Sequence, residues 1–225
     1  ESDGYIRNTT YNKDQGGQNL EDYGATIAYQ FTDTFDLLFT AQRTVDKSEV
    51  GAWADVNKKD FVAFEDAACL LTGPSFYGCF VSDTGSDEDH SSTNAPNNGD
   101  TTNDFYNLTM NYDVNDWIVT SITGYIDRDE DARLEYDGNS LEFLYVDTDQ
   151  SYSQFSQELR TTGNIGDVVL TTGIYYWYSE YDSEQISYDM WKWLPGPFPT
   201  NTFGGGWPVG TTQVISQHGE NKSFK

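Results

Sequence analysis

Two cysteines carry the first chemistry that the sequence suggests. Cys69 and Cys79 are ten residues apart, with Gly73, Pro74 and Gly78 between them. Thiols at this spacing around turn-forming residues favour a disulfide that closes a loop. We therefore expect a disulfide and an oxidising compartment such as the periplasm or the cell surface. A pair of reduced, partly buried thiols is the alternative.

Acidic runs suggest cation binding of a loose kind. Asp127–Asp131 alternates acids as a calcium loop does, but Ala132 stands where the sharp turn needs Gly, and Gly138 stands where a bidentate Glu belongs. A second acidic run spans 83–90 among Ser, Thr, Asn and Gly. We expect solvated acids and at most loosely bound calcium. The two histidines, His90 and His218, are far apart in the sequence and fall in predicted loops, so the sequence does not predict a zinc site.

Aromatic residues offer a second kind of binding. Trp191, Trp193 and Trp207 lie among prolines and glycines, where exposed rings could stack on a chelate ring or a sugar face. The alternative is that the rings pack against one another and fold the loop. No nucleophile elbow, phosphate loop or dinucleotide fingerprint occurs. With 37 acidic residues in the chain, some carboxylates will lie close together by chance, so such pairs do not indicate a glycoside hydrolase. We expect no enzyme.

The elements that position these residues are predicted to be strands. Apolar and aromatic residues alternate with small polar ones, and helical periodicity is weak, so the chain reads as all-β. Short turns join three predicted hairpins: 23–31 with 35–45, 105–112 with 117–126, and 152–162 with 168–181. Residues 4–8 are predicted to end a seventh strand. Glu158 and Arg160 share a face opposite Phe155 and Leu159, and so should face away from the apolar side.

Short turns alternate with long polar connections near 46–102, 130–150 and 182–225. Long structureless loops are uncommon in compact soluble domains, but strands of about ten residues with short turns at one rim and long loops at the other are typical of an antiparallel, up-and-down transmembrane β-barrel. The long connections would then be extracellular. Tyr and Trp near strand ends fit interfacial girdles, although cross-strand packing in a soluble sandwich would also explain them.

Composition excludes several classes of protein. The formal net charge of −25 disfavours nucleic acid as a partner. An aromatic content of 16% is too high for a disordered acidic chain. No apolar run of 18 residues occurs, so a transmembrane helix is not predicted, whereas barrel strands average out to a polar sequence.

Three motifs resemble TonB-dependent receptors. They are Asp3-Gly4-Tyr5-Ile6-Arg7-Asn8, Thr120-Ser121-Ile122-Thr123-Gly124-Tyr125 after a Trp-led strand, and Gln154-Phe155-Ser156-Gln157-Glu158-Leu159-Arg160-Thr161, of which the last is the most specific. Their order and spacing match, so the resemblance covers nearly all of 1–225 outside the long loops.

The resemblance implies an outer-membrane receptor of a Gram-negative bacterium. Such a receptor is a 22-stranded barrel that encloses a plug and imports iron chelates, vitamin B12 or glycans with energy relayed through TonB. About seven strands cannot close that barrel, and open sheet edges in lipid are not viable, so we expect a piece of a larger barrel whose plug lies elsewhere. The expected partners are outer-membrane lipid, the TonB complex through the plug, and a small ligand, with a ferric siderophore favoured. The alternative is a secreted acidic β-sandwich that binds carbohydrate with calcium.

Overall fold

The computed structural model describes residues 1–49, 89–94, 97–135, 145–188 and 213–224, and these residues contain strands and no helices. The strands are β1 (Ile6–Asn8), β2 (Lys13–Gln15), β3 (Leu20–Thr32), β4 (Phe35–Asp46), β5 (His90–Ser91), β6 (Asn98–Val114), β7 (Trp117–Glu135), β8 (Tyr145–Ile165), β9 (Val168–Tyr188) and β10 (Gln213–Phe224). Among the described residues, a helix suited to crossing a membrane is not found.

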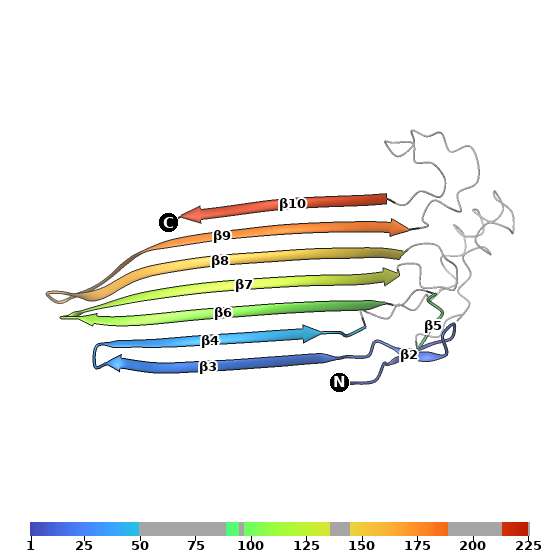
Figure 1. Ribbon diagram of the computed structural model, residues 1–225, viewed down its shortest axis with the longest axis horizontal. Coiled ribbons are helices and arrows are strands. Elements are labelled where there is room, and N and C mark those ends of the chain that lie inside the picture. The colour runs from blue at the N-terminus through green and yellow to red at the C-terminus, as the bar shows by residue number, and fades with distance from the viewer. Residues whose placement is uncertain (50–88, 95–96, 136–144, 189–212, 225) are drawn as a thin grey trace, which may run out of the picture.

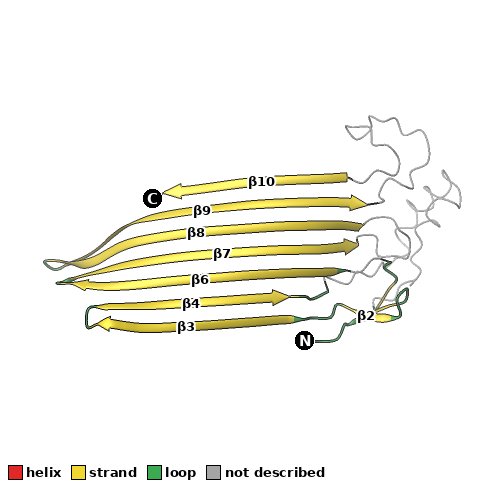
Figure 2. Cartoon of the chain, viewed as in Figure 1, coloured by secondary structure: helices red, strands yellow, loops and turns green. Residues whose placement is uncertain are grey.

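Seven of these strands form one antiparallel sheet in the order β10-β9-β8-β7-β6-β4-β3 (Figure 1). Neighbours in the sheet are also neighbours in the chain, apart from the two-residue β5, so the topology is up-and-down. The three short turns lie together at one end of the sheet (Figure 2). We call this the turn side, and the opposite end the loop side.

Each of these turns leaves only two residues between its strands. They are Asp33 and Thr34, Asn115 and Asp116, and Gly166 and Asp167. Asn115 has φ 55° and Gly166 has φ 61°, the left-handed conformation that tight hairpin turns require. The prediction of three hairpins with short turns is therefore confirmed.

The sheet has two chemically different faces. Side chains alternate between them, and the register places one row of mostly large apolar residues across the sheet on one face: Tyr29, Leu37, Met110, Ser121, Leu159 and Ile174. The row beside it lies on the other face: Gln30, Asp36, Asn111, Thr120 and Arg160. We call these the belt face and the polar face. Glu158 and Arg160 lie on the polar face, opposite Phe155 and Leu159 as predicted.

The belt face changes its chemistry halfway along the strands. The register aligns Tyr106, Tyr125, Phe155 and Tyr178 in one row, and from there to the turn side the face is largely apolar. On the loop side of that row the same face is acidic, with Asp104, Asp127, Asp129, Asp131, Asp147, Asp149, Glu180, Asp182, Glu184 and Glu220. The strands run through this change without interruption.

Little of the apolar surface is buried. Among the described residues only Ile6 and Ala132 are buried hydrophobic side chains, whereas Ile27 is 59% and Ile174 54% exposed. A β-sandwich would bury such a face against a second sheet. The described long strands form one sheet, as the barrel prediction requires and the sandwich alternative does not.

Three strand predictions need correction. Residues 4–8 do not contribute to the seven-stranded sheet, because Ile6–Asn8 pairs with β2 and β5 in a separate three-stranded sheet. The seventh strand is instead β10, within 182–225, which was predicted to be loop. Strands β6 to β9 are also 17 to 21 residues long, and so extend into the predicted loops 46–102, 130–150 and 182–225. Both faces of these extensions are mostly polar, which weakens the alternation that marks a strand.

Candidate functional site

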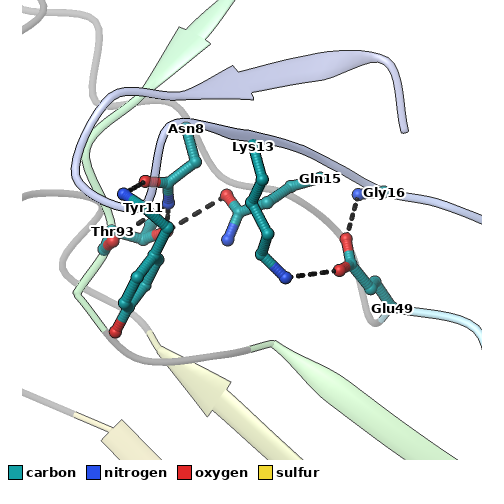
Figure 3. A network of polar contacts seen from close by, with 7 residues as sticks. All are labelled: Asn8, Tyr11, Lys13, Gln15, Gly16, Glu49 and Thr93. Atoms are coloured by element: carbon teal, nitrogen blue, oxygen red, sulfur yellow. Dashed lines mark hydrogen bonds and ion pairs between the residues drawn. The ribbon is translucent and has the colours of Figure 1, made fainter. Parts of the chain in front are cut away.

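The small sheet at the loop side is held by a buried polar network (Figure 3). Asn8 Nδ2 donates to Thr93 Oγ1 at 2.8 Å and to the Thr93 carbonyl at 3.0 Å. Thr93 Oγ1 donates to Gln15 Oε1 at 3.1 Å, and the Tyr11 N–H donates to Asn8 Oδ1 at 2.8 Å. Asn8 and Thr93 have no exposed surface and Gln15 has 2%. The network therefore fixes 1–16 against 89–94, two segments far apart in the chain.

Glu49 connects this small sheet to the end of β4. Its Oε2 accepts the Gly16 N–H at 2.7 Å, and its Oε1 lies 3.0 Å from Lys13 Nζ (Figure 3). The Asn19 N–H also donates to Ser48 Oγ at 3.0 Å. The loop side of β3 and β4 thus carries an ordered polar structure rather than a simple turn.

The strongest candidate for ligand contact is a patch on the polar face near the loop side. The register places Arg128, Tyr152 and Tyr181 directly opposite one another on β7, β8 and β9. They line a hollow of about 200 Å³ together with Glu130, Gln150 and Ser151. We call Arg128, Tyr152 and Tyr181 the arginine-tyrosine row.

The row combines a cation with flat rings. Arg128 is exposed, and its Nη2 lies 2.5 Å from Glu130 Oε2. Tyr152 is half-buried, and its hydroxyl donates to Gln154 Oε1 at 2.6 Å, which fixes the ring. Phenol rings can stack on a planar ligand, and a guanidinium can bind a carboxylate or a ring face. The row therefore suits a small ligand that has both anionic and aromatic groups.

Small residues leave room beside the row. Trp177 on β9 lies in register with Ser156 and Gly124, on the same face and four residues nearer the turn side than Tyr181 and Tyr152. A side-chain carbon at Gly124 would come within 2.7 Å of Ser156 Oγ. The absence of a side chain at Gly124 therefore leaves room for the Ser156 side chain, which lies in register between Gly124 and Trp177.

A polar ladder follows on the turn side of the same face. Asn111 Nδ2 donates to Asp36 Oδ2 at 3.1 Å, and Thr120 Oγ1 donates to Asn111 Oδ1 at 3.0 Å. Arg160 lies opposite Thr120, with its Nη1 3.2 Å from Glu158 Oε1. This region offers hydrogen-bonding groups to anything that fills the space over the polar face.

A separate group could hold a metal ion. Glu180, His218 and Glu220 have ligand atoms within 4.8 Å of one another, and no other such group occurs within the part of the chain that the structure describes. His218 lies in β10 and not in a loop, which corrects the prediction. Its Nδ1–H donates to Asp182 Oδ1 at 2.7 Å, and this hydrogen bond raises the pKa of His218 above 6.5. The group is on the belt face and so does not belong to the arginine-tyrosine row.

The predicted disulfide, the predicted ligand-contact residues and most of the second acidic run lie outside the described residues. These are Cys69, Cys79, Trp191, Trp193 and Trp207, together with the acidic run 83–88. The run Asp127–Asp131 lies within β7, where successive side chains point to opposite faces, so it does not form a calcium loop. Sequence patterns missed the arginine-tyrosine row because its members come together only through the register of three strands.

Comparisons with known proteins support the fold. No protein-family model matches the sequence, and no curated protein sequence matches it. Among solved structures, the chain is similar to the crystal structure of the ferric yersiniabactin uptake receptor FyuA from Yersinia pestis, with a TM-score of 0.51 and 11% sequence identity. The match covers 98% of this chain and 37% of that receptor, so this chain spans little more than a third of its length. The chain thus has the fold of part of a β-barrel wall.

Proposed function

We propose that this chain forms part of the barrel wall of a TonB-dependent receptor in the outer membrane of a Gram-negative bacterium. The receptor imports a ferric siderophore and has no enzymatic activity. Its partners are outer-membrane lipid, the TonB complex through a plug, and the iron chelate. Nucleic acid is not a partner of so acidic a protein.

The belt face is the single observation that carries this proposal. An apolar face that no second sheet of the described residues covers is stable next to lipid, and lipid meets the exterior face of an outer-membrane barrel. From Tyr106 to Val114 the strand advances about 27 Å at roughly 3.4 Å a residue, which at a tilt of about 40° gives a height of about 20 Å. Outer-membrane barrels have an apolar band about 25 Å tall, so the belt is of suitable height.

Tyrosines lie at the loop-side boundary of the apolar part of the belt face. The Tyr125 hydroxyl donates to Asp127 at 3.4 Å and the Tyr178 hydroxyl donates to Glu180 at 3.2 Å. Each ring lies on the apolar side and each hydroxyl points to a carboxylate on the loop side. Tyrosine takes this orientation where an apolar phase meets water. In the proposal the loop side faces outside the cell, because the long connections of outer-membrane barrels are extracellular.

The arginine-tyrosine row supports the proposed ligand class. It lies on the polar face, which lines the lumen when the belt face meets lipid, and it is near the loop side by which a ligand would enter. Many iron chelators are anionic and contain planar rings, and these are the groups that Arg128, Tyr152 and Tyr181 can bind. The similarity to a receptor for ferric yersiniabactin points to the same ligand class.

Cysteine accessibility tests the membrane position. In a background with Cys69→Ser and Cys79→Ser, a cysteine replaces either Leu159 on the belt face or Ser156 on the polar face of β8. In outer-membrane vesicles, a water-soluble maleimide is expected to label the cysteine at position 156 and not the one at 159. Equal labelling of both positions, or recovery of the protein in a soluble fraction, would contradict the membrane position.

Binding of ferric chelates by the complete receptor, and their uptake through it, test the proposed ligand class. Arg128→Ala is expected to weaken ferric yersiniabactin binding about tenfold, as expected for loss of a central arginine contact. Arg43→Ala is the matched control, because Arg43 is also paired with a carboxylate, Asp104, but on the belt face. If radiolabelled ferric chelates of the phenolate, catecholate and hydroxamate classes are all taken up equally with and without the receptor, the siderophore proposal is wrong.

A further inference from the structure

Four side chains form a block on the acidic half of the belt face, on strands β9 and β10. The register pairs Glu180 with Glu220 and Asp182 with His218. Residues two apart along a strand point to the same face, so all four side chains project together. The block lies immediately on the loop side of the row that contains Tyr178 and Lys222.

The histidine in this block is oriented as a metal ligand would be. Its Nδ1–H donates to Asp182 Oδ1 at 2.7 Å, which leaves the Nε2 lone pair available. Nε2 lies 3.8 Å from Glu220 Oε1, and the ligand atoms of Glu180, His218 and Glu220 all lie within 4.8 Å of one another. In metal sites the ligating histidine donates its other N–H to a carboxylate in the same way.

The surroundings favour a cation of a particular class. Asp182 and His218 line a hollow of about 310 Å³ whose other acids are Asp149 and Glu184. The nearby cation is Lys222, with Nζ 3.6 Å from Glu220 Oε2 and 5.0 Å from the centre of the Tyr178 ring. Calcium and magnesium prefer oxygen ligands alone, whereas one imidazole with two carboxylates suits zinc. The imidazole therefore distinguishes this group from the rest of the acidic surface.

We propose that Glu180, His218 and Glu220 bind a divalent transition-metal ion of the zinc class. Asp182 is a positioning residue that holds the imidazole, and water completes a four-coordinate site. The group lies on the belt face, away from the arginine-tyrosine row, so this inference goes beyond the proposed transport function and does not depend on it. A metal here would join β9 to β10 at the outer boundary of the belt.

Calorimetric titration of the complete receptor, purified in detergent micelles, with Zn²⁺ tests the proposal. One tight zinc site per chain is expected at neutral pH after treatment with EDTA. His218→Gln should weaken that site about tenfold or more because it removes a ligand, and Asp182→Asn should weaken it about 10- to 100-fold through loss of imidazole orientation. Glu184→Gln is the matched control, because it removes one acid from the same hollow without removing a ligand.

Cobalt gives a readout that loss of charge alone would not change. The wild-type chain with Co²⁺ should show the visible absorption of a four-coordinate site, and His218→Gln should abolish it while far-UV circular dichroism stays unchanged. The proposal is overturned if His218→Gln binds Zn²⁺ within twofold of wild type, or if Glu184→Gln weakens binding as much as Glu180→Gln. Uptake of a ferric chelate is not part of this test, so its outcome is separate from that of the transport proposal.

Discussion

The turn-side and loop-side halves of the seven-stranded sheet share one continuous backbone and differ in their side chains. On the belt face, Ile27 and Ile174 lie in the turn-side half, while Asp131 and Asp149 lie in the loop-side half of the same surface. Backbone hydrogen bonds are the same in both halves, so they do not decide what each half contacts. The side chains on one face of a strand therefore determine what that face contacts, and this can change partway along a single strand.

The largest expected effect comes from placing a charge in the turn-side half of the belt face. Leu159→Arg puts a guanidinium near the middle of the proposed lipid-facing band, where it should destabilise the barrel by about 2–4 kcal/mol. Reversible urea unfolding of the complete receptor in lipid vesicles would measure this free energy.

The control is the same charge in the loop-side half. Asp149→Arg lies on the same face and strand, ten residues away, and should change stability by no more than about 1 kcal/mol if that half faces water. Equal destabilisation at both positions would break the comparison, because it would mean that both halves have the same surroundings.

The sequence predicted the turn-side half well for a physical reason. In residues such as Leu37, Thr40, Leu108 and Asn107, large apolar groups alternate with polar ones because one face is apolar and the other is not. That alternation predicted the hairpins, the short turns and the face on which Glu158 and Arg160 lie. It ends where the belt face becomes acidic, and so the predicted strands ended there too.

Strand β10 was missed for the same reason. Most of its described length lies beside the acidic half, where Ser216, His218 and Glu220 on the belt face are as polar as Gln217 on the other. The arginine-tyrosine row and the Glu180–His218–Glu220 group were also beyond sequence reasoning. Both depend on which residue of one strand lies opposite which residue of the next, and single-strand patterns do not contain that register.

A second prediction concerns how the loop side is held together. Asn8→Ala removes the side chain that bonds Thr93 and the Tyr11 N–H, and leaves buried polar groups without partners at a cost of about 1–3 kcal/mol. The loss should be local, because among the described residues the small sheet shares no strand pairing with the seven-stranded sheet and contacts β4 only through side chains such as Glu49 and the connecting segment. Hydrogen exchange should therefore become faster in 6–15 and remain unchanged in β7 and β8.

Asn19→Ala is the control for this effect, since Asn19 is exposed on the same segment. It should leave exchange in 6–15 as in the wild type. If Asn8→Ala instead lowers protection throughout the seven-stranded sheet, the small sheet and the seven-stranded sheet unfold together. The small sheet would then not be an independent unit of stability.

Replacing glycines with alanine at the two ends of the sheet tests a smaller difference in side-chain packing. At the turn side, the Trp117 ring lies against Gly163, and a side-chain carbon there would collide with it. Gly163→Ala should cost about 1 kcal/mol, at the low end for overpacking because the ring can move. At the loop side, Gly219 has no atom within 4 Å of the same added carbon, so Gly219→Ala should be nearly neutral. Urea unfolding midpoints that show equal losses would contradict the difference in packing.

The smallest expected effect is a titration in the loop-side half. In the metal-free chain, the hydrogen bond to Asp182 and the nearby carboxylates of Asp182, Glu180 and Glu220 raise the pKa of His218 above its ordinary value of 6.5. NMR of the imidazole in the presence of EDTA should show this, and Asp182→Asn should bring the pKa back toward 6.5. A His218 pKa that Asp182→Asn leaves unchanged would mean that the pair does not form in solution.

The sign of the effect on stability follows from the direction of that shift. Because the folded state binds the proton more tightly than the unfolded state, the contribution of His218 is fully present below pH 6.5 and is lost as the pH rises through the raised folded pKa. Its size is small, since the imidazole is exposed and water screens the pair. Unfolding midpoints of wild type and Asp182→Asn should therefore differ more at acidic than at alkaline pH. The difference in unfolding midpoint between Leu159→Arg and wild type should not vary with pH over the same range, because the guanidinium stays charged and no other group at this position titrates.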